Sequence, residues 1–239
     1  MAATSGGGAG PSIGVLMLDS RFPRIPGDMG HPATWAFPVR WAVVPGATPE
    51  AVVRRGAPRL LDAFIAAGRR LVVEGAAGIT TTCGFLTPFQ GDLAAALGVP
   101  VAASSLMQVP LVERLLAPGR RAGVLTIAAS SLTPAHLAAA GVAPDTPIGT
   151  TEGGREFTRA ILCDAPTLDV AAARADAVDA ARALAAAHPE VGAVVLECTN
   201  LTPYQADIRA ATGLPVFSVV DVSCRMRAGL APRRWPAPG

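Results

Sequence analysis

The chain has 239 residues, enough for two small domains or one large one. Its formal charge is +2 and only 16% of its residues are charged, which excludes a nucleic-acid-binding protein that relies on electrostatics. All 20 basic residues are arginines. Without lysine the chain has no Schiff-base residue for pyridoxal phosphate and no phosphate-binding lysine of the P-loop or kinase type, so those enzyme classes are excluded.

The chain shows no signal for a membrane or a metal. Its uncharged window from 93 to 112 contains Gly98, Pro100 and Pro110, which argue against a spanning helix. Residues 1 to 11 lack a basic and an apolar region, so we expect a flexible tail there and a cytoplasmic protein. The four cysteines lack the spacing of metal ligands, and we expect free thiols and no metal site.

Short apolar runs alternate with alanine-rich stretches, and this alternation predicts an α/β fold with helices covering parallel sheets. A strand is expected over 13–18. The prolines and aromatic residues of 27–46 predict an ordered, irregular loop with some strand. Apolar residues at helical spacing predict a helix over 49–67. Further along we expect strands over 79–83, 122–126, 193–198 and 215–220, and helices over 155–162 and 170–187.

An internal repeat indicates two related halves. Residues 82–101, TCGFLTPFQGDLAAALGVPV, align at an offset of 115 with 197–216, ECTNLTPYQADIRAATGLPV, and eleven of the 20 positions are identical. A Gly-Val-Leu strand precedes each copy. The shared Thr-Pro-aromatic-Gln sequence predicts a capping threonine, helices beginning at Pro88 and Pro203, and a glutamine that completes a capping box. Two copies of one α/β unit are the simplest explanation.

Each copy places a cysteine, Cys83 or Cys198, at the carboxyl end of a strand in the loop that leads into a helix. Open α/β sheets bind ligands at this position, so we expect both loops to face one cleft. A thiolate can remove a proton from one face of a carbon while a thiol returns one to the other face. A cysteine that merely packs as a small apolar residue is the common alternative, and we assign that role to Cys163 and Cys224.

At these residues the chain resembles the aspartate/glutamate racemase superfamily, which includes hydantoin racemases and arylmalonate decarboxylase. The matching motifs are Leu18 to Ser20, Thr82 to Gly84, Gly123 to Thr126 and Cys198 to Asn200. The resemblance implies two pseudo-twofold-related Rossmann-like domains, each with a parallel sheet flanked by helices, and an active site in the cleft between them. Residues 12–103 with 218–239 would form the first domain, and 104–217 the second.

The resemblance also implies an isomerase without a cofactor, namely a racemase or epimerase of an amino acid or a derivative such as a hydantoin. Cys83 and Cys198 would be its acid and base. Arylmalonate-type decarboxylation, cis/trans isomerisation of a small dicarboxylate, and a non-enzymatic small-molecule-binding protein remain alternatives. Decarboxylation needs only one proton donor, so the presence of both cysteines favours racemisation. We expect a small carboxylate substrate and an even-numbered homo-oligomer such as a homodimer.

The residues around the cysteines are implied to bind substrate, with the N–H groups of Gly84 and Thr199 holding its carboxylate. The implied substrate-binding residues are Asp19, Ser20, Thr82, Gly84, Phe85, Thr126, Thr199 and Asn200. Phe85 indicates an apolar pocket. Asp19 fits a catalytic partner or a turn residue equally well, and 27–32 fits a substrate-covering loop or an ordinary surface loop. Alternation along the strand predicts that Glu197 points away from Cys198 and has a structural or supporting role.

Overall fold

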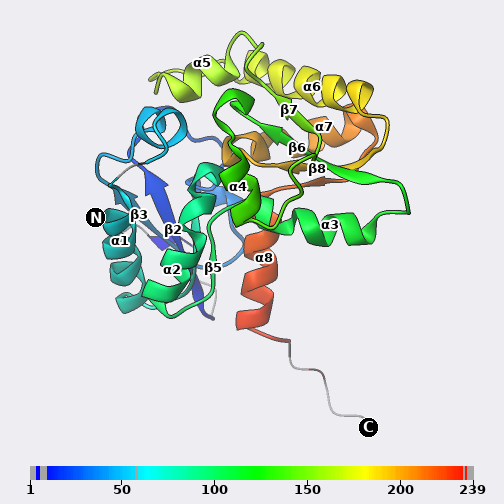
Figure 1. Ribbon diagram of the computed structural model, residues 1–239. Helices are drawn as coiled ribbons and strands as arrows, with labels where there is room; N and C mark the ends of the chain where they lie inside the picture. The colour runs from blue at the N-terminus through cyan, green and yellow to red at the C-terminus, as the bar shows by residue number, and fades with distance from the viewer. Residues whose placement is uncertain (1–3, 6–9, 58, 234, 236–239) are drawn as a thin grey trace.

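The computed structural model describes residues 4–5, 10–57, 59–233 and 235. Its strands form two sheets, each with four parallel strands and flanked by helices (Figure 1). The first sheet has the order β1-β3-β2-β4-β5, with β1 antiparallel at its edge, and the second has the order β7-β6-β8-β9. The α/β fold with two parallel sheets is confirmed.

The first sheet contains the strands from the beginning of the chain: β1 (Thr4–Ser5), β2 (Ser12–Leu18), β3 (Val39–Val44), β4 (Ala76–Thr81) and β5 (Val101–Ala102). Helix α1 (Leu61–Val73) packs against β2, β3 and β4. β1 pairs with β3, so this part of the expected tail is a strand, while 1–3 and 6–9 lie outside the described residues. A short 3-10 helix, η1 (Pro32–Thr34), interrupts the loop before β3.

The second sheet contains β6 (Arg121–Thr126), β7 (Ile148–Thr150), β8 (Val191–Leu196) and β9 (Val216–Phe217). Helix α6 (Val170–Ala187) packs against β6 and β7, and α3 (Val109–Leu115) also contacts β6. The Asp169 side chain caps α6, whose buried residues recur about every four positions, as a helix with one apolar face requires. The remaining α-helices of this half are α4 (Pro134–Ala139), α5 (Phe157–Leu162) and α7 (Gln205–Thr212).

The chain passes from the first sheet to the second after β5. After β9 it continues as α8 (Val219–Leu230), which packs against β2 and β4 of the first sheet (Figure 1). Val219 belongs to a buried cluster with Val15 and Trp41. The proposed division into 12–103 with 218–239 and 104–217 stays a prediction. Within the described part of the chain, no helix is long and apolar enough to cross a bilayer.

The helix expected over 49–67 is wrong in its middle. A π-helical turn, η2 (Glu50–Arg54), is followed by a break, and α1 begins only at Leu61. Gly56, Ala57 and Arg59 have φ values of +69°, +50° and +67°, which no right-handed helix accommodates. The apolar spacing of 49–67 therefore reflects two separate elements that contribute to one core.

The strand expected over 215–220 is wrong beyond Phe217. Ser218 begins α8 with a capping box. Its hydroxyl accepts the Asp221 N–H, and its own N–H donates to Asp221 Oδ2 at 2.6 Å. Val219 and Val220 are therefore helical although β-branched residues favour strands, because the cap fixes the chain direction at this point.

The capping expected in the repeat is also wrong. In both copies a 3-10 helix, η3 (Gly84–Phe89) or η6 (Thr199–Tyr204), leads into an α-helix, α2 (Gln90–Leu97) or α7. The Thr87 hydroxyl lies inside η3 and donates to the Gly84 carbonyl, so it does not cap a helix. The Gln90 amide donates to Val101 O and accepts from Ala103 N, and Gln205 likewise donates to Val216 O. Each glutamine thus holds an edge strand to its helix.

Candidate active site

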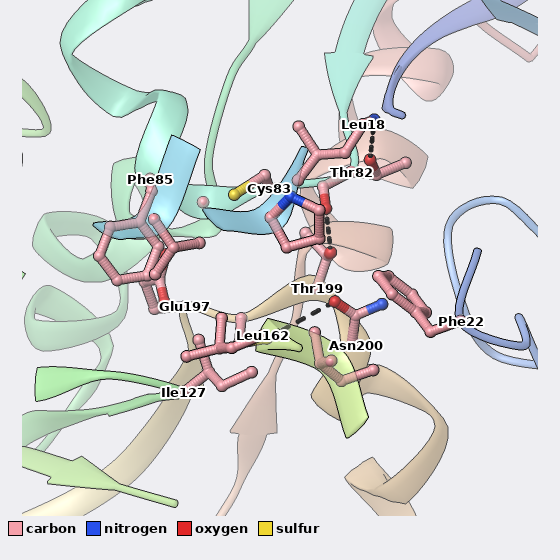
Figure 2. A pocket seen from close by; sticks show the side chains of 15 residues that line it. Leu18, Phe22, Thr82, Cys83, Phe85, Ile127, Leu162, Glu197, Thr199 and Asn200 are labelled. Carbon is pink, nitrogen blue, oxygen red and sulfur yellow. Dashed lines mark hydrogen bonds between the residues drawn. The ribbon is translucent and has the colours of Figure 1, made fainter. Parts of the chain in front are cut away.

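A small, largely apolar cavity lies at the carboxyl ends of β4 and β8, and both repeat cysteines line it (Figure 2). Cys83 stands between β4 and η3, and Cys198 stands between β8 and η6, at equivalent positions of the repeat. The two residues are 7% and 6% exposed. The structure thus brings together the two residues expected to carry the chemistry. No group of three or more potential metal ligands occurs among the described residues.

The expected substrate-binding residues fall into two groups. Thr82, Gly84, Phe85, Thr199 and Asn200 line the cavity. Asp19, Ser20 and Thr126 contact other groups: Asp19 is exposed and accepts the Gly46 N–H, the Ser20 hydroxyl accepts from Arg24, and the Thr126 hydroxyl donates to Glu197. The contacts of Asp19 are those of a turn residue.

Glu197 lies in the same cavity wall as the cysteines, so the expectation that it points away is wrong. β8 ends at Leu196, and the alternation of a strand does not extend to the next two residues. The carboxyl group is fully buried. Thr126 Oγ1 donates to its Oε2 at 2.7 Å, whereas Oε1 has no hydrogen-bond partner. Burial raises the pKa of Glu197 to about 7, although the hydrogen bond from Thr126 acts in the opposite direction.

The absence of a side chain at Gly84 makes room for this carboxyl. A Cβ at Gly84 would lie 2.2 Å from Glu197 Oε1 and 2.4 Å from the Glu197 carbonyl oxygen, far inside van der Waals contact. Gly84 begins η3 in the first half of the chain, and Glu197 follows β8 in the second. The two halves therefore pack closely beside the carboxyl group.

The surroundings of both thiols favour their neutral forms. Burial, followed by the charge of Glu197, raises the pKa of Cys83 and of Cys198 above the ordinary value. The backbone N–H groups of Phe85 and Asn200 act in the opposite direction on Cys83 and Cys198 respectively. Smaller effects distinguish the thiols, since Arg24 lowers the pKa of Cys83, whereas the charge of Cys83 and then that of Asp28 raise the pKa of Cys198.

The two halves of the site differ at one position of the repeat. The offset of 115 equates Glu197 with Thr82. The Thr82 hydroxyl accepts the Leu18 N–H at 3.0 Å, and the Thr82 carbonyl accepts the Thr199 hydroxyl at 2.6 Å. The first half therefore places a neutral, satisfied hydroxyl where the second half places a buried carboxyl, so only the second of these two equivalent positions can carry a negative charge.

A buried ion pair that the sequence did not reveal supports the opposite side. Asp28 is 2% exposed; its Oδ1 pairs with Arg24 Nη1 at 2.8 Å, and its Oδ2 accepts from Asn200 Nδ2 at 2.6 Å. The 27–32 loop thus holds a residue of the cavity wall in place. Nothing in the sequence distinguishes this aspartate from an ordinary turn residue, because Asn200, the cavity residue that it holds, lies 172 positions away along the chain.

A contact between the two halves lies beside the cavity. Phe22 and Leu162 both line it. Beside them, Asp164 accepts the N–H groups of Arg21 at 2.6 Å and of Phe22 at 3.2 Å, and pairs with Arg21 Nε at 3.1 Å. This contact joins the two halves of the chain beside the cavity. The free volume of the cavity is about 20 Å³. Typical small-molecule sites measure about 300–1,000 Å³, so the cavity has to widen before it holds a substrate.

The comparisons with known proteins give clear relatives, although no family model matches the chain. The chain is 32% identical over 217 residues to a dimethylsulfoniopropionate lyase of Durusdinium sp. clade D, covering 87% of this chain and 71% of that protein. It is 33% identical over 229 residues to dimethylsulfoniopropionate lyase 6 of Emiliania huxleyi, covering 92% of this chain and 60% of that protein.

Solved structures share the fold. Unliganded arylmalonate decarboxylase covers 96% of both chains with a TM-score of 0.57 and 21% identity. Allantoin racemase from Pseudomonas fluorescens covers 95% of this chain and all of its own, with a TM-score of 0.56 and 16% identity. The chain therefore has the fold that its resemblance to the aspartate/glutamate racemase superfamily implied.

The expected isomerase function is wrong. The relatives that match about nine tenths of the chain are lyases, whereas the racemases share only the fold. A pair of thiols therefore does not by itself specify racemisation. The cytoplasmic location and the even-numbered homo-oligomer stay predictions.

Proposed function

Because this chain belongs to the dimethylsulfoniopropionate lyase family, we propose that it cleaves the carbon–sulfur bond of dimethylsulfoniopropionate, or of a closely related sulfonium carboxylate, by elimination. The observation that carries the proposal is the match to such lyases over 87% and 92% of the chain. The cavity supports it, because its two thiols suit the removal of a proton from carbon. The small carboxylate expected from the sequence is retained as the substrate class.

The reaction needs one base. A thiolate removes a proton from the carbon next to the carboxylate, and the electron pair of that C–H bond forms the carbon–carbon double bond. The carbon–sulfur bond breaks, and its electron pair leaves with the sulfur. The products are dimethyl sulfide, acrylate and the proton, which passes from the thiol to water. Because dimethyl sulfide leaves as a neutral molecule, no acid is needed on the opposite face, and the two thiols need not have equal roles.

We assign the base to Cys83. The nearby Arg24 favours its thiolate, whereas Asp28 disfavours that of Cys198. The Cys198 thiol also faces Asn200 Oδ1 at 3.8 Å, an acceptor that favours the protonated form. Cys198 then acts as a neutral thiol that contacts the substrate from the other side.

The backbone supplies the groups for the carboxylate. The first N–H groups of a helix have no partner within it, and η3 and η6 both begin at the cavity with Gly84 and Thr199. Donors at these positions would stabilise the negative charge that moves onto the carboxylate as the proton leaves. Ile127, Ile161 and Leu162 supply an apolar wall around the reacting carbons.

The test is the purified full chain with dimethylsulfoniopropionate, with dimethyl sulfide measured by gas chromatography and acrylate by proton NMR. We expect the two products in equal amounts. Cys83→Ser should lower kcat by about 10²–10⁴-fold, the usual contribution of a positioned base. Cys198→Ser should retain more activity and show its main defect in KM.

Cys163→Ser is the matched control, because Cys163 is exposed. It should behave like the wild type. Absence of both products with folded wild-type protein would overturn the proposed reaction. Full activity of Cys83→Ser would overturn the assignment of the base while leaving the reaction in place.

A further inference from the structure

The Glu197 carboxyl can accept more hydrogen bonds than the fold supplies. Its carboxyl is fully buried, its Oε2 accepts one hydrogen bond from Thr126, and its Oε1 is unpaired. An ionised carboxylate removed from water is costly unless a counter-charge or several donors compensate it. A single hydroxyl supplies only part of that compensation, so the folded chain leaves this carboxyl in the cavity wall without the counter-charge that its ionised form needs.

No cation pairs with this carboxylate within the part of the chain that the structure describes. Arg24, the basic residue that influences the Cys83 thiol, is engaged with Asp28 at 2.8 Å and with the Ser20 hydroxyl at 3.0 Å. Among the described residues, Glu197 takes part in no ion pair. A positive charge beside Glu197 would therefore have to come from a bound molecule.

Aromatic and apolar groups accompany the carboxyl. Phe85 and Phe22 line the same cavity, and Figure 2 shows Phe85 and Glu197 on one side of it and Phe22 and Asn200 on the other. The Phe85 ring packs edge-on against His136, with ring centroids 5.3 Å apart. Aromatic rings attract methylated onium cations, whose positive charge is spread over an apolar surface. A carboxylate beside a phenyl ring is a suitable environment for such a group.

We propose that Glu197 recognises the positive charge of the substrate, so that the cavity selects carboxylates that carry a methylated onium group. This inference rests on the proposed function and gives it a specificity residue. Dimethylsulfoniopropionate has the required form, with a carboxylate for the N–H groups of η3 and η6 and a dimethylsulfonio group for Glu197. A carboxylate of equal shape without the onium charge would leave the carboxylate of Glu197 unpaired.

The same pairing would help to activate the base. Glu197 and the two thiols share one buried cavity, and each negative charge opposes the formation of another. An onium cation beside Glu197 offsets the first charge, which lowers the cost of forming the Cys83 thiolate. Carboxylates that lack the onium group would bind without lowering the cost of forming the Cys83 thiolate, so the thiolate would form mainly when a substrate with an onium group is bound.

The test uses two ligands of equal shape, 3-(trimethylammonio)propanoate, whose trimethylamine is a much poorer leaving group than dimethyl sulfide, and 4,4-dimethylpentanoate, which has a carbon in place of the nitrogen cation. Their affinities for the full chain are measured by titration calorimetry. We expect the wild type to bind the cation at least about tenfold more tightly, as a buried carboxylate facing an onium group implies. Glu197→Gln should remove this preference and bind the two ligands about equally.

Glu190→Gln is the matched control, because it makes the same chemical change just before β8 rather than just after it. It should retain the preference of the wild type. Equal binding of both ligands by the wild type would overturn the inference without any variant. A Glu197→Gln protein that binds both ligands more weakly but keeps their ratio would also overturn it, because the residue would then only position other groups.

The result is independent of turnover. A chain that releases dimethyl sulfide but does not distinguish the two ligands refutes the role of Glu197 alone. A chain that prefers the cation but releases no dimethyl sulfide refutes the proposed reaction and leaves the recognition of onium carboxylates standing.

Discussion

Glu197→Gln should gain stability relative to the wild type as the pH rises from acidic to alkaline, although we expect it to impair substrate recognition. The native fold buries the carboxyl and raises its pKa from 4.5 to about 7. Glutamine has the same shape and its carbonyl can still accept the Thr126 hydroxyl, but it carries no charge to be removed from water.

The sign of the effect follows from proton binding. Between the two pKa values the native state binds more protons at Glu197 than the unfolded state does, so stability falls as the pH rises. Below 4.5 both states are protonated and there is no penalty, whereas above about 7 both are ionised and the penalty is complete. The difference between the two pKa values corresponds to about 3 kcal/mol.

Urea unfolding of the wild type and of Glu197→Gln, from about pH 4.5 to about pH 8, measures this directly. The unfolding free energy of the variant, relative to that of the wild type, should increase by about 3 kcal/mol across this range. The unpaired N–H groups of the new glutamine side chain lower the unfolding free energy of the variant by an amount that does not depend on pH, so they leave the change with pH unaffected. A difference that does not change with pH would refute the reasoning, because Glu197 would then be paired or solvated in the native state.

Two further predictions concern the closure of the halves. Gly84→Ala would place a methyl group 2.2 Å from Glu197 Oε1, and should abolish activity and destabilise the fold by about 1–3 kcal/mol. The control Gly91→Ala meets open space within α2 and should stabilise the fold by about 0.5–1 kcal/mol. Urea unfolding in which both variants change the unfolding free energy in the same direction would contradict the packing described at Gly84. Asp164→Ala removes the acceptor of the Arg21 N–H and should let iodoacetamide label the cavity thiols several-fold faster. The lost backbone hydrogen bonds cause most of this effect, because the exposed ion pair contributes little. An unchanged labelling rate would show that other contacts limit access to the cavity.

The repeat allowed the halves of the fold to be predicted, because identical residues at a constant offset fold alike. η3 and η6 have six residues each, and the helices that follow them both end at a glycine with positive φ, Gly98 at +64° and Gly213 at +72°. The pairing of Cys83 with Cys198 in one cavity also follows from this equivalence, since the carboxyl ends of matching strands face each other across the halves.

Roles that depend on partners distant in sequence could not be predicted. Gln90 looked like part of a capping box, yet its amide holds β5, which becomes its neighbour only in the folded sheet. Val219 and Val220 have the composition of a strand and became helical through the side chain of Asp221. Local sequence specifies propensity, and tertiary contacts decide the outcome where propensities conflict.

The two acidic residues of the site show the same limit. Asp28 lies in a loop rich in glycine and proline, and its burial depends on Arg24 and Asn200. Glu197 differs from its repeat partner Thr82, and this difference was visible in the alignment. A charged residue that replaces a neutral one beside a repeated cysteine is a signal that could have identified it as part of the site.

The charge on one side of the cavity also gives the site a handedness. A substrate that places its onium group towards Glu197 and its carboxylate towards η3 and η6 is held in one orientation, and only one of the two hydrogens on its reacting carbon then faces Cys83. Those hydrogens are chemically equal in water and become distinct in the cavity. Dimethylsulfoniopropionate that carries deuterium in one stereochemical position of that carbon should therefore give acrylate that keeps the label, and its mirror-image isotopomer should give acrylate that has lost it.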